Sequence, residues 1–292
     1  MGDYLLKATG FNGEVRAYAI QSTDTVEEAR QRQDTWATTS AALGRTMTIA
    51  TMLGAMLKGD DKLTVKVEGD GPVGAVIADA NAMGEVRGYV VNPHVDFESN
   101  QHGKLDVKRA VGTEGTLSVV KDVGLKNHFT GQVPIVSGEI SEDFTYYLAN
   151  SEQVPSAVGA GVLVNPDHSV LSAGGFIVQM LPGAAEDTIT SVEDNISSIP
   201  AISQLIQEGK TPEEMLGLLL GDGNFTIHEE VPVQFSCPCS KERLETAIQG
   251  LGNKEIDAMI REDHGATASC HFCNETYTFT IDELRALKRT EA

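Results

Sequence analysis

The chain has 292 residues, 41% of them hydrophobic, and a formal net charge of −20 at pH 7. This length provides one large domain or two to three smaller ones with an ample core. No apolar run approaches the roughly 20 residues of a membrane span, and the N-terminus lacks the features of a signal peptide, so we expect a cytoplasmic protein that does not bind membranes. The acidic field repels phosphate backbones and argues against nucleic-acid binding.

Residues 1–181 are predicted to form an α+β core domain. An apolar, helix-like stretch that starts after Asp24 predicts one long helix ending near Gly59, and residues 141–148 predict a second, capped helix. Alternating or apolar runs predict strands at 15–20, 62–67, 74–78, 85–91, 115–120, 158–164 and 173–181. The mixture indicates a domain built around an extended, mainly antiparallel sheet with helices, whose strand order the sequence does not give.

Residues 182–230 are predicted to form a helical linker. An apolar stripe recurs at helical spacing through Ile189, Val192, Ile196 and Ile199. The run 211–214 (TPEE) starts a further helix, with Thr211 as its N-cap and proline at its first position. This segment carries ten acidic residues and a single basic one, Lys210. We expect it to be only marginally stable unless neighbouring elements cover its apolar side chains.

Residues 231–292 are predicted to form a separate small domain. Ser240 can cap a helix that runs to about residue 250, and Asn253 can cap another. A strand at 277–279 and a final helix with Leu284 and Leu287 complete the predicted elements. About sixty residues with so few apolar side chains give a thin core, so we expect a metal to stabilise the fold.

The four cysteines of the chain all lie in this small domain, in two tight pairs. Cys237 and Cys239 form a C-x-C motif, and Cys270 and Cys273 form a C-x-x-C motif after 30 intervening residues. Four thiols at this spacing are typical of a four-sulfur zinc site, although the same sulfurs could form disulfides. Disulfides are rare in the cytosol, where thiols are usually metal-bound or redox-active.

Such a site can couple oxidation to unfolding. Zinc holds its cysteine ligands as thiolates, the form that oxidants attack. Loss of a ligand weakens the metal site, and loss of the metal unfolds a domain that depends on it. A thiol–disulfide oxidoreductase and a static zinc-stabilised scaffold are the alternative interpretations. His264 and His271 are alternative ligands. The 69–71 run (GDG) lacks the spacing and lysine of a phosphate loop and is expected to be a turn.

The cysteine pattern at the end of a chain of this length resembles the heat-shock protein 33 family of chaperones. C-x-C is less common in zinc ribbons than C-x-x-C, which makes the pattern specific. Further stretches that match the family are 69–72 (GDGP), 151–156 (SEQVPS), 173–176 (AGGF) leading to Gln179 and Pro182, and 239–243 (CSKER). The resemblance covers essentially the whole chain.

The resemblance implies a redox-regulated, ATP-independent holdase that acts in the stress response and is not an enzyme. In the reduced, inactive state, Cys237, Cys239, Cys270 and Cys273 would bind one Zn²⁺. Oxidation would form Cys237–Cys239 and Cys270–Cys273 disulfides, release zinc, unfold the C-terminal domain and destabilise the linker. The exposed surface would bind unfolding client proteins, and the active form would be a homodimer.

Overall fold

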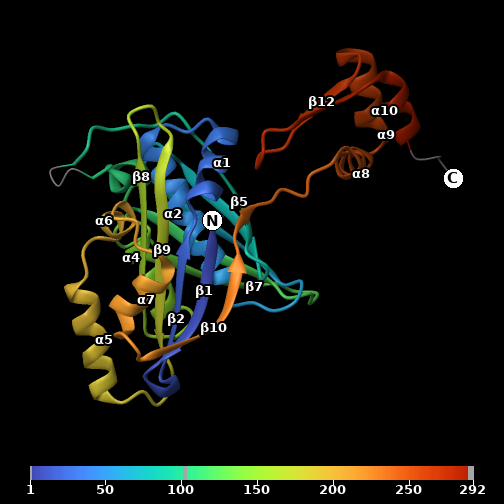
Figure 1. The fold of residues 1–292 in the computed structure, drawn as a ribbon. Helices are drawn as coiled ribbons and strands as arrows, with labels where there is room; N and C mark the ends of the chain where they lie inside the picture. Colours follow the sequence, from blue (N-terminus) through green and yellow to red (C-terminus); the bar gives the residue numbers. More distant parts are fainter. Residues whose placement is uncertain (1, 101–103, 289–292) are drawn as a thin grey trace. The chain divides into compact units, whose positions relative to one another are not determined.

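The computed structural model describes residues 2–100 and 104–288 and divides into two compact units, Met1–Ser236 and Cys237–Ala292. It is an α+β structure with antiparallel sheets, as the sequence predicts (Figure 1). The compact boundary falls after Ser236, because residues 225–235 pair with strands of the first unit. The division into a core domain, a linker and a switch domain at 181/182 and 230/231 stays a prediction.

The first unit contains two sheets, where the sequence predicted one extended sheet. The five-stranded sheet is antiparallel throughout and has the order β10 (Phe225–Pro232), β1 (Tyr4–Gly10), β2 (Val15–Gln21), β9 (Val170–Met180) and β8 (Ser156–Val164). The six-stranded sheet has the order β11 (Gln234–Phe235), β5 (Glu85–Val90), β4 (Ala75–Asn81), β3 (Lys62–Gly69), β6 (Gly115–Asp122) and β7 (Phe129–Pro134). Only its β11–β5 pairing is parallel.

The predicted long helix is two helices, α1 (Thr23–Gln33) and α2 (Ala37–Gly54). The break occurs because Asp34 takes the left-handed conformation (φ 51°), which aspartate tolerates, and Trp36 is extended. Sixteen of the eighteen residues of α2 are buried, and α2 contacts strands of both sheets. It therefore forms the centre of the main hydrophobic core. The short helix α3 (Val107–Val111) and the helix α4 (Ser141–Asn150), predicted from its first turn, complete this part.

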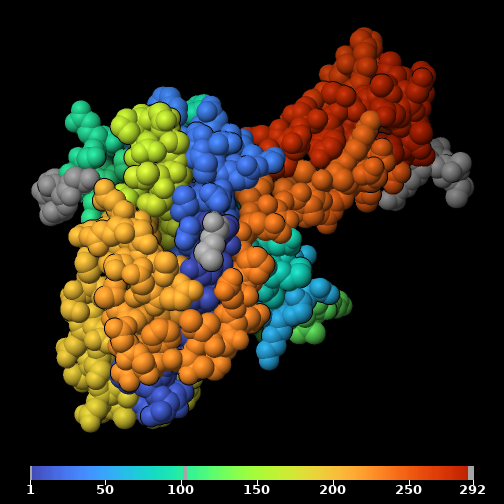
Figure 2. All heavy atoms as spheres, in the orientation of Figure 1, coloured from blue at the N-terminus to red at the C-terminus, as the bar shows by residue number. Residues whose placement is uncertain are grey.

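The segment predicted as the linker forms three helices, α5 (Glu186–Ser198), α6 (Ile202–Gln207) and α7 (Pro212–Leu220). The predicted capping box is confirmed, because Thr211 accepts a hydrogen bond from the Glu214 N–H and Glu214 accepts one from the Thr211 N–H. In Figure 2 this yellow-to-orange segment forms a layer over one side of the first unit.

Apolar side chains alternate between the two faces of the first sheet. On β1 and β2, Leu5 and Ile20 belong to the main core around α2, whereas Leu6 and Ala17 belong to a second cluster on the other face. The helices α5 and α7 cover that second cluster. Among the described residues, no helix is long and apolar enough to span a bilayer.

The second unit contains α8 (Lys241–Leu251), α9 (Asn253–Ala258), a π-helical turn (Met259–Asp263), the hairpin β12 (Ala266–Ser269) and β13 (Thr276–Phe279), and α10 (Ile281–Leu287). Ser240 caps α8 as predicted, whereas the N-cap of α9 is Gly252 and not Asn253. The buried core of this unit is small and consists of Ile248, Ile256, Phe279, Leu284 and Leu287. The thin core that the sequence predicts is therefore present.

Candidate metal centre

Two loops of the second unit carry the cysteines. Cys237 and Cys239 lie in the segment before α8, where the Arg243 guanidinium donates a hydrogen bond to the Pro238 carbonyl at 2.7 Å. Cys270 and Cys273 lie in the turn of the β12–β13 hairpin. The Cys270 N–H donates to the Glu275 carbonyl at 2.9 Å and thereby closes this turn. These hydrogen bonds help to position both loops, and the four cysteines form no disulfide.

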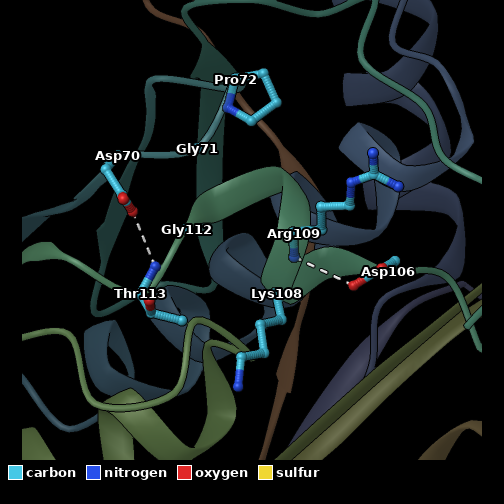
Figure 3. A pocket seen from close by; sticks show the side chains of 8 residues that line it. All are labelled: Asp70, Gly71, Pro72, Asp106, Lys108, Arg109, Gly112 and Thr113. Carbon is cyan, nitrogen blue, oxygen red and sulfur yellow. Dashed lines mark hydrogen bonds between the residues drawn. The ribbon is translucent and has the colours of Figure 1, made fainter.

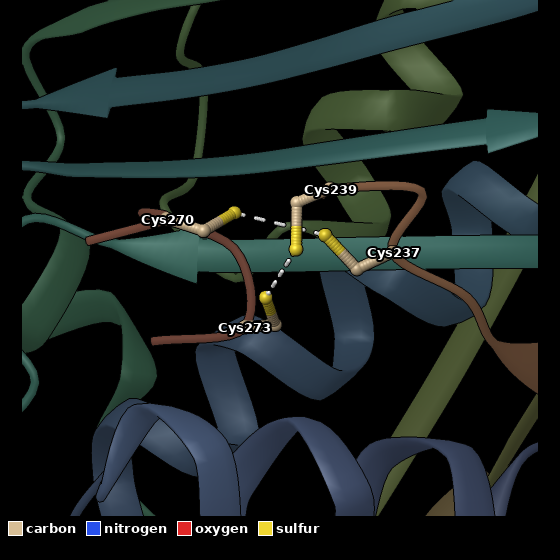
Figure 4. Close-up of side chains that lie close together, drawn as sticks. All are labelled: Cys237, Cys239, Cys270 and Cys273. Carbon is tan, nitrogen blue, oxygen red and sulfur yellow. Dashed lines mark hydrogen bonds between the residues drawn. The ribbon is translucent and has the colours of Figure 1, made fainter. Parts of the chain in front are cut away.

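The four sulfurs converge on one point (Figure 4). Their Sγ atoms all lie within 4.8 Å of one another, with 3.7 Å between Cys237 and Cys270 and 3.1 Å between Cys239 and Cys273. Sulfurs around a tetrahedral zinc ion lie roughly 3.8 Å apart, given Zn–S distances near 2.3 Å. All four cysteines are free thiols in this structure. The donor set and its spacing therefore fit a four-coordinate thiophilic metal ion.

The protonation of the buried thiol in the cluster depends on whether a cation is bound. Cys273 is buried, and its burial, together with hydrogen bonds from the other thiols, raises its pKa. Without a cation, the Cys273 thiol would thus remain protonated. A divalent metal reverses this balance because it deprotonates its thiol ligands. The backbone N–H of Glu275 already acts in the same direction, since its hydrogen bond to Cys273 lowers the pKa.

A tyrosine that the sequence did not single out lies against this centre. The Tyr277 hydroxyl on β13 is 3.4 Å from the Cys239 Sγ, and this contact raises the pKa of Tyr277 to about 12. The contact depends on the pairing of β12 with β13 and on the fold of both cysteine loops. Only the spacing of Tyr277 four residues after Cys273 could have hinted at it.

Comparison with known proteins identifies the family. A family model described as Hsp33 protein matches residues 3–280. The chain belongs to the Hsp33 family. It is 68% identical to a 33 kDa chaperonin of Oceanobacillus iheyensis over 289 residues, covering 99% of this chain and 100% of the relative. It is 64% identical to the 33 kDa chaperonin of Bacillus subtilis over 286 residues, covering 98% of both chains.

The fold comparison agrees with this assignment. The crystal structure of the 33 kDa chaperonin (heat shock protein 33 homolog) from Thermotoga maritima superimposes with a TM-score of 0.91 at 37% identity, covering 98% of each chain. The chain is therefore a member of a chaperone family with the same α+β architecture. The resemblance that the cysteine pattern indicates is confirmed.

Other candidate residues of this Hsp33 family member do not join the cluster. Among the described residues, the group that could hold a metal ion consists of the four cysteines, without His264 or His271. The 69–71 run lies in a close backbone contact (Figure 3), where Asp70 accepts hydrogen bonds from the N–H groups of Thr113 and Glu114. A Cβ atom at Gly71 would lie 2.4 Å from the Ala110 carbonyl oxygen. These glycines therefore permit close packing of a turn, as expected.

Proposed function

We propose that this protein is a redox-regulated, ATP-independent holdase that binds unfolding proteins in the cytoplasm. The observation that carries the proposal is the convergence of all four cysteines within 4.8 Å in a unit with a small core. In the reduced state, Cys237, Cys239, Cys270 and Cys273 bind one Zn²⁺, which holds their sulfurs as thiolates and joins the two loops. In this state the second unit is folded and the chaperone is inactive.

Oxidation removes these ligands from the metal in pairs. A disulfide between Cys237 and Cys239 and another between Cys270 and Cys273 use all four sulfurs for S–S bonds and leave no thiolate for a metal. In the folded unit, contacts of 3.7 Å and 3.1 Å instead join sulfurs of different loops, those of Cys237 and Cys270 and of Cys239 and Cys273, and none of these distances is that of an S–S bond, about 2.05 Å. The proposed pairing therefore requires both loops to rearrange, which agrees with oxidation being accompanied by unfolding of the unit.

The surface available for client proteins lies beneath the linker helices. In α5 and α7, Val192, Leu216 and Leu219 are almost fully buried against the outer face of the first sheet. The sheet contributes Leu6 and Phe176 to the same cluster. Burial of each such side chain contributes about 1.5–3 kcal/mol to the packing. Release of the helices would expose both halves of this cluster and provide the apolar surface that a holdase needs.

The cover provided by α5 is incomplete. A cavity of about 470 Å³ lies between this helix and the ends of β8 and β9, and Ile189 and Ile196 are only half-buried at its wall. Val192, Ile196 and Ile199 of the predicted apolar stripe pack on this cluster, but the packing leaves space. This loose contact supports a linker that can dissociate. The charge of −20 would keep the activated form soluble while apolar surface is exposed.

Light scattering of a thermally aggregating client protein tests the proposal. The reduced, zinc-loaded protein is compared with the same sample after warm peroxide treatment, and we expect aggregation to be suppressed only by the oxidised sample. Size-exclusion chromatography of both samples tests the proposed homodimerisation upon activation. If both samples suppress aggregation to the same extent, the four cysteines would form only a structural zinc site. Catalytic turnover of a model disulfide substrate would instead indicate a thiol–disulfide oxidoreductase.

A further inference from the structure

The hydroxyl of Tyr277 is aimed at one ligand of the cysteine cluster. It lies 3.4 Å from the Cys239 Sγ and 3.5 Å from the Cys239 carbonyl oxygen. The Tyr277 ring is half-buried and packs on the small core of the second unit, and this packing restrains the orientation of the side chain. Opposite Tyr277 in the hairpin is Ala268, whose small side chain sits in the same core.

We propose that Tyr277 is a positioning residue that donates a hydrogen bond to the Cys239 sulfur, strengthens its hold on the metal and slows its oxidation. The inference rests on the zinc-binding part of the proposed function. A thiolate has no proton to donate, so in the metal-bound state the phenol must be the donor. The phenol has one proton and two candidate acceptors, and the charged sulfur is the stronger acceptor of the two.

The hydrogen bond affects the chemistry of oxidation directly. In the first step a lone pair of the Cys239 sulfur attacks one peroxide oxygen, the O–O bond breaks, and sulfenic acid and hydroxide are formed. In the second step the Cys237 thiolate attacks that sulfur, the S–S bond forms, and a second hydroxide leaves. Peroxide accepts the two electrons that the two sulfurs lose. A hydrogen bond donated to the Cys239 sulfur withdraws electron density from it, and so makes this sulfur a poorer nucleophile.

Outer-shell partners of this kind also orient the ligand. Loss of such a partner typically lowers metal affinity by about 10–100-fold. The variant Tyr277→Phe retains the packed ring and removes only the hydroxyl. We expect its zinc affinity, measured by chelator competition, to fall by about tenfold or more. We also expect Cys239 to be oxidised several-fold faster in peroxide, measured by timed alkylation and peptide mass spectrometry.

A spectroscopic readout separates positioning from a structural effect. In the cobalt-loaded protein, the thiolate-to-metal charge-transfer band should shift in Tyr277→Phe, because the donor on one thiolate is lost. Tyr146→Phe, a matched change in the first unit, should leave affinity, band and oxidation rate unchanged. Fluorotyrosine at position 277 makes the hydroxyl a stronger donor and should shift the band and the oxidation rate in the opposite direction. This replacement keeps the test valid even if Tyr277→Phe disturbs folding.

The outcomes distinguish this inference from the proposed function. Wild-type protein that binds no metal through four thiols would overturn the proposed function and the Tyr277 inference with it. If wild-type protein binds one zinc, but both replacements at 277 keep the wild-type cobalt spectrum and Cys239 oxidation rate, the role of Tyr277 alone is refuted.

Discussion

Truncation of a core side chain in the second unit should make the proposed redox switch more sensitive to oxidants. Leu284 in α10 is completely buried in a core that has five buried residues. Leu→Ala substitutions at such sites cost about 2–5 kcal/mol, because apolar contact is lost and a cavity remains. A value of about 3 kcal/mol corresponds to roughly 150-fold more of the open unit at equilibrium. For a unit of this size, that is a large share of its total stability.

The expected consequence concerns the rate of zinc release. If oxidants attack the sulfurs mainly through the open state, Leu284→Ala should accelerate peroxide-driven release by up to about 150-fold, while opening and closing remain fast. A chromogenic zinc chelator follows the release, and amide hydrogen exchange in the second unit reports opening. The oxidant dose that activates suppression of client aggregation should fall in parallel.

The second unit offers a matched control. Leu251 in α8 is 56% exposed, so Leu251→Ala makes the same chemical change and should alter stability by less than about 0.5 kcal/mol. Equal zinc-release rates for Leu284→Ala, Leu251→Ala and the wild type would show that oxidants reach the sulfurs in the folded unit. Attack through the open state would then be ruled out, and oxidation would precede unfolding.

Three further predictions concern the linker, pH and metal removal. Leu216→Ser, at a fully buried position of α7, should make the reduced protein bind a hydrophobic dye, whereas Leu218→Ser at a 39% exposed position should not. Burial raises the pKa of Glu152, but hydrogen bonds from Lys121 and Tyr147 outweigh this effect and lower the pKa below its usual value of 4.5. The stability that these bonds contribute is therefore present above pH 4.5 and is lost as the pH falls through the lowered pKa. Lys121→Met should make the free energy of unfolding depend less on pH in this range. A chelator applied to the reduced protein should abolish hydrogen-exchange protection in the second unit and leave the sheets of the first unit protected.

Local sequence signals predicted the elements that depend on local physics. The capping box at Thr211 and the cap at Ser240 place helix starts correctly because the stabilising hydrogen bonds lie within three residues. Alternating apolar residues predicted β3 and β6 because one face of each strand is buried. The cysteine cluster was predictable from chemistry, since four thiols in two pairs have few other uses.

Features that depend on distant pairing were missed. β10 was not predicted because most of its side chains are exposed and carry no apolar alternation; its backbone pairs with β1, more than 200 residues away. The prediction of a single helix from after Asp24 to near Gly59 was wrong because apolar spacing continues across the turn at Asp34. Tyr277 escaped notice because only the folded hairpin and loops bring its hydroxyl to Cys239.

The two apolar clusters of the first unit explain how a linker could dissociate without unfolding the whole protein. Leu5 and Ile20 pack with α2 in the main core, and this packing does not involve α5 or α7. Leu6 and Ala17 on the opposite face pack with those helices. Loss of the helices would therefore expose one face of the first sheet while the other face and the six-stranded sheet keep their core. In a fold of this kind a large apolar surface can be covered in one state and exposed in another, because the helices that cover this surface are separate from the elements that stabilise the domain.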